Sequence, residues 1–303
     1  FWMSAQERRS LFLKSSGRFE TLERVMHGIF FLCGFVAVGF VLLIAIYLVA
    51  SGLPAIREIG LADFLFGTTW SSTAKENPQF GILPMILTSV YGTAGAVVLG
   101  VPVGFLTAVF LSKIASPKLA AVIRPAVELL AGIPSVVYGL VGMMILLPAI
   151  RNVFDLAVGD SLLAAIIVLA VMILPTVISG TETALNAVPQ EYEQGSLALG
   201  ATEIETYFKV SVPAAKSGIA ASVVLGIGRA IGEAMAILMV AGNVPNMPSL
   251  LTSVKFLTTA VAGELSYSSG LQRQALFSIG LVLFLFIMMI NVILNVVLKR
   301  ERK

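Results

Sequence analysis

Two oppositely charged side chains stand inside an apolar stretch near the end of the chain. Ser217–Ala241 has the composition of a membrane-spanning helix but contains Arg229 and Glu233. An arginine in the middle of such a helix costs about 2.5–3.5 kcal/mol on insertion scales, so it requires a partner or a ligand. Their spacing places both side chains on one helical face, where they can form an ion pair. Alternatively, Arg229 faces a passage and offers its donor fork to an oxyanion, while Glu233 limits how tightly the anion is held.

Pairs of glycines occur in two apolar stretches. Gly228 and Gly232 stand beside the charged pair, and their spacing lets another helix pack closely and keeps the charges inside a bundle. Gly100 and Gly104 have the same spacing on either side of Pro102. A kink is expected at this proline, because it cannot donate a backbone hydrogen bond inside a helix.

A third group of polar atoms surrounds Pro134. Proline lacks an N–H, so a carbonyl of the preceding turn loses its usual partner. Ser135 and Tyr138 bring hydroxyl groups close to this break. Broken helices are used at transport sites, which predicts that both side chains line a passage. The alternative is a kink that only packs against its neighbours.

The polar segment 185–213 predicts two short helices joined by a tight bend. Gly200 suits the left-handed residue that ends a helix. Thr202 and Glu205 have the spacing of a capping box, which begins a second helix. Pro213 is expected to end that helix.

Both predicted helices carry side chains on one face that could meet a partner. These are Tyr192, Ser196 and Leu199 on the first helix and Ile204, Tyr207 and Phe208 on the second. Apolar residues exposed outside a membrane need a groove to occupy. The alternative is a helix pair that lies on the lipid surface.

The spacing in this segment resembles the coupling loop of ABC importer permeases, whose signature is Glu-Ala-Ala, three residues, Gly, nine residues and Ile-x-Leu-Pro. Gln194, Gly195 and Ser196 stand at the first positions, followed at the right spacing by Gly200 and Val210–Pro213. Gln194 stands in place of the Glu of the signature, and Gly195 and Ser196 stand in place of its two Ala residues. Val210 and Val212 stand in place of Ile and Leu. The resemblance implies that the loop inserts into a cleft of a separate ATPase.

The residues expected to make this connection are Gln194, Gly195, Ser196, Leu199, Gly200, Tyr207 and Pro213. The chain has no G-x-x-x-x-G-K-[ST] phosphate loop, so it is not expected to bind or hydrolyse ATP. The resemblance implies that ATP and Mg²⁺ are used by the partner and that this chain binds no cofactor.

From about Phe64 to the end of the last span, the sequence also resembles the phosphate-specific permeases. The matching stretches are Phe66–Trp70, Phe80–Pro84, Glu128–Gly139 and Gly226–Ala236. Trp70 and Glu128-Leu129-Leu130 look like the C-type subunit rather than its A-type partner. The resemblance implies a phosphate importer with an A-type permease, a dimer of ATP-binding subunits and an external phosphate-binding protein as partners.

Three other classes of protein match part of the pattern. A permease for another oxyanion, such as sulfate or molybdate, remains open because one arginine does not distinguish tetrahedral anions. A secondary transporter or channel would need no ATPase. An intramembrane enzyme has little support, because no His, Cys and Asp cluster has the spacing of a metal site or a nucleophile. The single Cys33 excludes a disulfide within the chain.

The elements that must position these residues are membrane helices. Of the 303 residues, 57% are hydrophobic and 12% charged, against roughly 45–50% and 25% in soluble domains. A helix needs about 20 apolar residues to cross a bilayer. The runs of this length are Met26–Ala50, part of Asn77–Ser112, Leu129–Ile150, Ser161–Thr181, Ser217–Ala241 and Gln274–Leu298. The predicted fold is all-α, a polytopic membrane protein with six transmembrane helices that resembles the type I ABC importer permeases.

Basic residues gather at alternate ends of the predicted spans, which indicates membrane orientation rather than nucleic-acid binding. By the positive-inside rule, both termini are cytoplasmic in a bacterial inner membrane, and six spans satisfy this condition. We expect a cytoplasmic amphipathic segment at 1–24 and the permease domain at 25–303. The long outer loops are expected at 51–80 and 242–273, and the coupling loop at 185–213.

Overall fold

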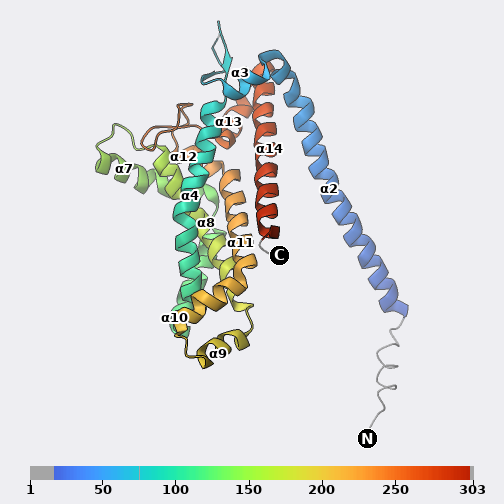
Figure 1. Cartoon of the computed structure of the whole chain (residues 1–303). Coiled ribbons are helices and arrows are strands. Elements are labelled where there is room, and N and C mark those ends of the chain that lie inside the picture. Colours follow the sequence, from blue (N-terminus) through green and yellow to red (C-terminus); the bar gives the residue numbers. More distant parts are fainter. Residues whose placement is uncertain (1–16, 75, 301–303) are drawn as a thin grey trace. The chain divides into compact units, whose positions relative to one another are not determined.

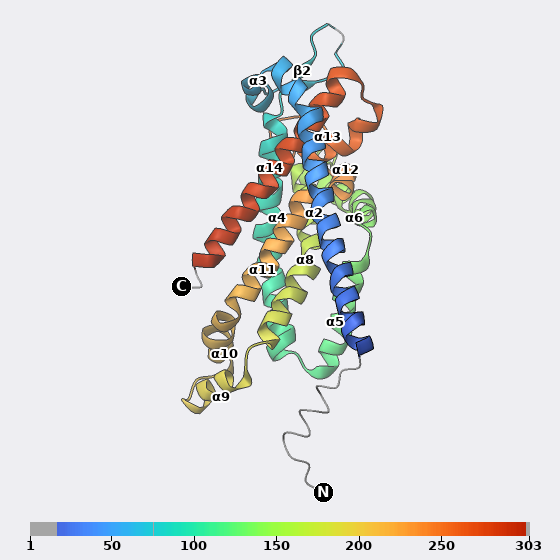
Figure 2. The ribbon, with the colours of Figure 1, turned by 90° about the vertical axis from the view of Figure 1, so that its right-hand side faces the viewer.

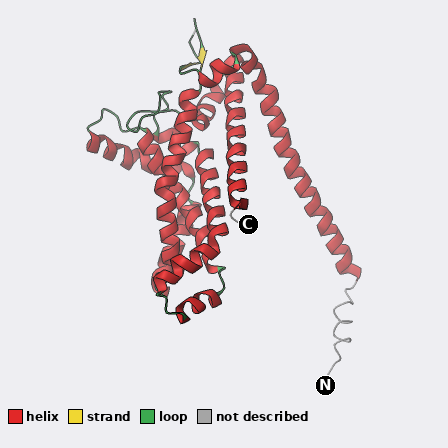
Figure 3. Cartoon of the chain, in the orientation of Figure 1, coloured by secondary structure: helices red, strands yellow, loops and turns green. Residues whose placement is uncertain are grey.

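The computed structural model describes residues 17–74 and 76–300, which are almost entirely helical (Figure 3). Six helical segments are long and apolar enough to cross a membrane. They are Leu22–Ile59, Leu83–Ile114, Ser135–Phe154, Leu162–Asn186, Glu203–Gly232 and Gly270–Ile293. The prediction of an all-α fold with six spans is therefore confirmed. Most of the predicted amphipathic segment 1–24 lies outside the described residues, as do the basic residues Arg302 and Lys303.

The chain divides into two compact units, residues 1–50 and 51–303. The described part of the first unit belongs to helix α2 (Gly17–Ile59). In residues 22–50 the apolar side chains are largely exposed on all sides of the helix, including Phe30 at 66%, Phe31 at 76% and Phe35 at 70%. A helix that is apolar on every side is typical of a span surrounded by lipid or by other membrane helices.

Three helices form the core of the second unit (Figures 1 and 2). α8 (Leu162–Asn186) packs against both α4 (Leu83–Val109) and α11 (Val212–Gly232). It has the largest buried share of the six spans, 67% of its most apolar window. The apolar run that looked like an ordinary span in the sequence is therefore the centre of the bundle.

Small residues on α4 allow α8 to approach closely. A Cβ atom at Gly100 would lie 2.8 Å from the Ile173 side chain, and one at Gly104 would lie 2.9 Å from the Val177 side chain. This confirms the close approach predicted from the glycine spacing. α4 remains helical through Pro102.

At the end of the second unit that the sequence assigns to the outer side, α3 (Leu61–Phe66) is followed by a short antiparallel hairpin. β1 (Trp70–Ser71) pairs with β2 (Gln79–Phe80), and the Trp70 and Phe80 rings meet edge to face with centroids 5.8 Å apart. Cross-strand aromatic pairs of this kind stabilise a hairpin that is too short to be stable alone.

A second outer segment contains α13 (Leu257–Glu264) and the 3₁₀ turn η4 (Leu265–Tyr267). The Glu264 carboxylate accepts a hydrogen bond from Trp70 Nε1 at 3.3 Å and forms an ion pair with Lys255. One carboxylate thus connects the two segments that the sequence assigns to the outer side.

The last span belongs to α14 (Gly270–Arg300), which approaches the end of α2 within the second unit. The Ser278 hydroxyl donates to the Gly52 carbonyl at 2.6 Å. A Cβ atom at Gly52 would lie 2.9 Å from the Ser278 backbone nitrogen, so only glycine fits at this contact.

The third span starts later than predicted. The π-helical turn η1 (Phe110–Ile114) ends the second span, and α5 (Pro117–Gly132) is a separate helix. After a break at Ile133 and Pro134, the span consists of α6 (Ser135–Val141), η2 (Gly142–Leu146) and α7 (Leu147–Phe154). The prediction of a span from Leu129 was wrong, because hydropathy does not record the extended backbone that proline imposes on its predecessor.

The fifth span also differs from its predicted bounds of Ser217–Ala241. α10 (Glu203–Thr206), the π-helical turn η3 (Tyr207–Ser211) and α11 follow one another without interruption, and α11 ends at Gly232. A separate short helix, α12 (Met235–Val240), follows. The span therefore begins in the polar segment and ends before the apolar run does.

Candidate functional site

The segment predicted as a coupling loop forms a helix, a bend and a second helix. α9 (Gln190–Ala198) is followed by Gly200, whose φ of 89° lies in the left-handed region. The Thr202 hydroxyl accepts from the Glu205 backbone N–H at 3.3 Å, and the Glu205 carboxylate accepts from the Thr202 N–H at 3.2 Å. The predicted bend and capping box are both confirmed.

Apolar side chains on this segment project into open space. Tyr192 is 57% exposed, Leu199 is 91% exposed and Ile204 is 64% exposed. α9 and α10 lie at the end of the bundle opposite α3 and α13 (Figures 1 and 2). Leucine at 91% exposure is unfavourable in water, so these side chains are suited to a partner surface.

Ser196, like Tyr207, is half-buried, unlike the other residues expected on this face. Its hydroxyl shares a hydrogen bond of 2.8 Å with the buried Thr206 hydroxyl. The side chain therefore ties α9 to α10 instead of facing outward with Tyr192. The sequence could not identify Thr206 as its partner, because the bend decides which faces of the two helices meet.

Pro213 does not end a helix, contrary to the prediction. It is near the start of α11, directly after the π-helical turn η3. In that turn, the Val212 N–H bonds to the Tyr207 carbonyl, one residue further back than in an α-helix. This shift accommodates a residue that has no N–H and whose ring would otherwise crowd the preceding turn. The second helix of the loop is consequently continuous with the fifth span.

Glu193 holds α9 to the rest of the bundle. Its Oε1 atom lies 2.6 Å from Lys113 Nζ and accepts from the Ser211 hydroxyl at 2.7 Å. Burial alone raises the pKa of the Glu193 carboxyl, but the hydrogen bonds from Lys113 and Ser211 outweigh it and hold the pKa below its ordinary value. Glu193 is therefore ionised at neutral pH. Sequence reasoning missed this residue, because Lys113 lies on a distant segment.

Arg229 lies in the last turn of α11, near the end of the fifth candidate span rather than in its middle as expected, at a cavity of about 600 Å³. Its Nη1 atom donates to the Thr176 hydroxyl at 3.4 Å, and Asn291 lines the same cavity from α14. The remaining wall is formed by small and apolar residues of α11, namely Ala221, Val224, Leu225 and Gly228. Sequence reasoning missed the two polar residues Thr176 and Asn291. Asn291 could have been noticed, because a polar residue inside an apolar span often marks a functional site.

Glu233 does not share a helical face with Arg229. α11 ends at Gly232, and Glu233 has an extended conformation with ψ of 133°. Its Oε1 atom instead accepts from the Ala236 N–H at 3.0 Å, at the start of α12. Among residues 17–74 and 76–300, Arg229 and Glu233 form no ion pair. The ion-pair alternative is therefore not met, because it assumed an unbroken helix.

The break at Pro134 is stabilised by Tyr138. In a continuous helix the Leu130 carbonyl would accept from residue 134, which is proline. The Tyr138 hydroxyl donates to this carbonyl at 2.6 Å. Ser135 is the first residue of α6 and is half-buried. The geometry of Tyr138 favours the alternative that the break is a packed structural feature.

The two interrupted spans pack against each other beyond their breaks. A Cβ atom at Gly139 of α6 would lie 2.9 Å from the Ala236 Cα atom of α12. The fold therefore places α6 of the third span against α12, the short helix that follows the fifth span.

The close helix contact predicted at Gly228 and Gly232 is not made within the described chain. Nothing within the described chain lies within 4 Å of a Cβ atom built at either position. The close helix contacts of α11 are made instead by Gly180 with Ser222 and by Gly218 with Ala184. The side of α11 that carries the two predicted glycines is open in this chain.

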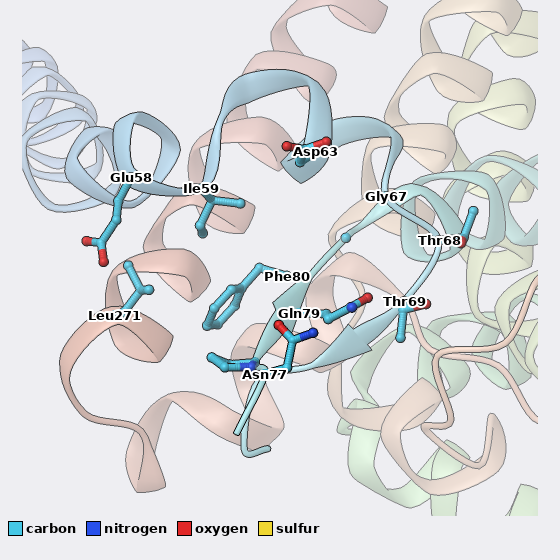
Figure 4. A pocket seen from close by; sticks show the side chains of 12 residues that line it. Glu58, Ile59, Asp63, Gly67, Thr68, Thr69, Asn77, Gln79, Phe80 and Leu271 are labelled. Carbon is cyan, nitrogen blue, oxygen red and sulfur yellow. The ribbon is translucent and has the colours of Figure 1, made fainter. Parts of the chain in front are cut away.

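A second cavity, of about 570 Å³, lies at the outer end near α3, β2 and the start of α14 (Figure 4). Glu58 and Asp63 contribute carboxylates to its lining, and Phe80 and Leu271 contribute apolar surface. Two carboxylates repel an oxyanion, so the Arg229 cavity is the better candidate for an anion pathway.

The sequence of this chain matches known transport proteins. Residues 100–303 match the family described as binding-protein-dependent transport system inner membrane component. The chain belongs to this family. With its six spans, the permease is a multi-pass inner-membrane component of an ABC transporter, and its role is transport rather than catalysis.

Several curated permeases are similar over most of the chain. The permease is 39% identical over 269 residues to the probable ABC transporter permease protein YqgH of Bacillus subtilis, with 86% of each chain covered. It is 33% identical over 286 residues to the phosphate transport system permease protein PstC of Haemophilus influenzae, with 87% of this chain and 90% of the relative covered. The resemblance to the C-type phosphate permeases is confirmed.

Solved transporter structures share the fold. The permease matches a chain of a bacterial importer of the acidic polysaccharide alginate with a TM-score of 0.60 and 12% identity, covering 95% of this chain and all of that chain. It matches the inward-facing methionine transporter MetNI with a TM-score of 0.56 and 20% identity, covering 73% and 94%. These similarities confirm the ABC importer permease fold.

Proposed function

We propose that this permease is the C-type subunit of an ATP-driven phosphate importer. It would form the translocation pathway with a related A-type permease and receive phosphate from an external binding protein. A dimer of ATP-binding subunits would hydrolyse ATP with Mg²⁺. The similarity to PstC proteins over more than four-fifths of the chain supports this assignment.

The observation that carries the substrate proposal is the Arg229 guanidinium at a cavity within the membrane region. It is hydrogen-bonded to a neutral hydroxyl, that of Thr176, and carries no carboxylate partner among the described residues. Its positive charge is consequently available to an oxyanion. The Asn291 amide can add a further hydrogen bond from the α14 side of the cavity.

The observation that supports coupling is the continuous helical path from the loop into the fifth span. A partner that moves α10 would act on η3 and α11 directly, and Arg229 lies near the far end of α11. A change in the ATPase could thereby alter the surroundings of the anion pathway without any flexible linker. The exposed Leu199 and Ile204 side chains would fill the partner's groove.

The proposal is tested with the complete complex in bacterial cells that lack phosphate uptake of their own. Expression of this permease with its partners should restore uptake of radiolabelled phosphate. Excess unlabelled phosphate should compete, whereas excess sulfate or molybdate should not. Competition by sulfate or molybdate at equal potency would identify a different oxyanion permease.

The dependence on ATP needs a separate measurement. Purified permease alone in liposomes should transport no phosphate, and the complete complex should require ATP. Transport by the permease alone along an ion gradient would show a secondary transporter instead.

A further inference from the structure

α9 is attached to the bundle by polar contacts rather than by apolar packing. None of the residues Gln190–Ala198 is buried, so apolar packing does not hold this helix in place. Its attachment depends on polar contacts made by Glu193 and Ser196. Polar contacts are directional and can be removed one at a time, which makes the attachment of α9 testable.

The Glu193 carboxylate is the centre of this attachment. A single oxygen, Oε1, contacts both Lys113 Nζ at 2.6 Å and Ser211 Oγ at 2.7 Å. The Lys113 side chain is 12% exposed and the Glu193 side chain 18% exposed, while Ser211 is fully buried. Ion pairs shielded in this way are much less screened by salt than surface pairs and hold a fixed geometry.

The two partners of Glu193 belong to different spans. Lys113 lies in η1 at the end of the second span, and Ser211 lies in η3 on the path into the fifth span. Both are π-helical turns, a feature frequently found at functional sites. One carboxylate oxygen therefore joins the exposed helix of the loop to two spans at once.

We propose that Glu193 is the positioning residue that passes a displacement of α9 to the second and fifth spans together. The inference rests on the proposed function in one respect, namely that an ATPase docks on α9. Without the carboxylate, a displacement of α9 does not reach the second span through this contact, and it reaches the fifth span only through the bend at Gly200 and α10. ATP hydrolysis would then drive much less transport.

The first test compares two alanine variants in the complete complex in liposomes. Glu193→Ala removes the contact, and Glu191→Ala removes an exposed carboxylate from the same helix as a matched control. Coupling between sites commonly spans about 5- to 150-fold, so we expect phosphate uptake per ATP hydrolysed to fall about tenfold in Glu193→Ala. Glu191→Ala should keep the wild-type ratio. An unchanged ratio in Glu193→Ala would overturn the inference.

A second variant separates positioning from folding. Exchanging the charges, with Lys113→Glu and Glu193→Lys together, keeps an ion pair and allows the new lysine to bond Ser211. We expect this double variant to regain most of the uptake per ATP that Glu193→Ala loses. An assembled double variant that stays uncoupled contradicts the inference. Failure of both variants to assemble would also contradict the inference, because Glu193 would then be required for folding.

A third measurement does not depend on the substrate. Leu225, 67% exposed beside the Arg229 cavity, is replaced by cysteine after Cys33→Ser. ATP binding to the complex should change the rate at which a thiol reagent labels this cysteine, and Glu193→Ala should strongly reduce that change. An undiminished response in Glu193→Ala overturns the inference even if phosphate proves to be the wrong substrate. If the wild-type complex shows the labelling response but takes up no phosphate, only the proposed function is contradicted.

Discussion

At the scale of single residues, Arg229 lies inside the membrane region with a hydroxyl rather than a carboxylate as its partner. Arg229→Gln removes the charge but keeps a hydrogen-bond donor. A hydrogen bond to a charged group contributes about 1.5–3 kcal/mol, so we expect phosphate uptake to fall by about 10- to 100-fold. The measurement is initial uptake in cells, with assembly checked by co-purification of the complex.

Arg151→Gln, an exposed arginine of α7, is the control and should leave uptake unchanged. Normal uptake by an assembled Arg229→Gln complex would exclude a pathway role. Failure of that complex to assemble would instead assign the guanidinium to the packing of α8 and α11.

Tyr138 gives a second prediction at this scale. Tyr138→Phe removes the donor that bonds the Leu130 carbonyl at the Pro134 break. We expect a loss of about 1 kcal/mol of stability, seen as a lower melting temperature of the detergent-solubilised complex. The phosphate concentration at half-maximal uptake should not change. A raised half-maximal concentration at unchanged melting temperature would show that the hydroxyl contacts the anion.

At the scale of elements, the bend between α9 and α10 depends on the backbone of Gly200. Its φ of 89° costs other residues about 1–2 kcal/mol, and more for a β-branched side chain. Gly200→Val should move α9 relative to α10 and lower phosphate uptake at least about tenfold. Gly39→Val in α2 is the control, because no described atom lies within 4 Å of an added Cβ there and Gly39 lies within a helix. Equal uptake by both variants would show that the bend tolerates another backbone conformation.

At the scale of the whole molecule, the two ends of the second unit should lie on opposite sides of the membrane. Tyr267 is 92% exposed near α13, and Leu199 is 91% exposed in the loop. After Cys33→Ser, a cysteine at Tyr267 should react with a membrane-impermeant thiol reagent from outside. A cysteine at Leu199 should react only in inverted vesicles, as the positive-inside rule requires. Labelling of both from one side would refute the six-span topology.

Local features of the chain were predicted from the sequence because they depend on neighbours in sequence. The number of spans follows from the length of apolar runs, and the bend at Gly200 and the capping box of Thr202 and Glu205 follow from residue types a few positions apart. The close approach at Gly100 and Gly104 also followed from spacing, since both glycines share one helical face.

Other features were decided only by the tertiary structure. The contacts of Arg229 with Thr176, of Glu193 with Lys113 and of Tyr138 with Leu130 depend on how helices and breaks are arranged in space. Hydropathy is nearly the same whether the backbone is helical or broken. The sequence therefore did not show where the third and fifth spans end, or that Arg229 and Glu233 are separated by a break. The sequence alone determined that this chain has the six spans of a permease and a bend between two helices before the fifth span. The packing of α8 between α4 and α11 determined which polar side chains meet, because contacts between distant segments exist only once the bundle has formed.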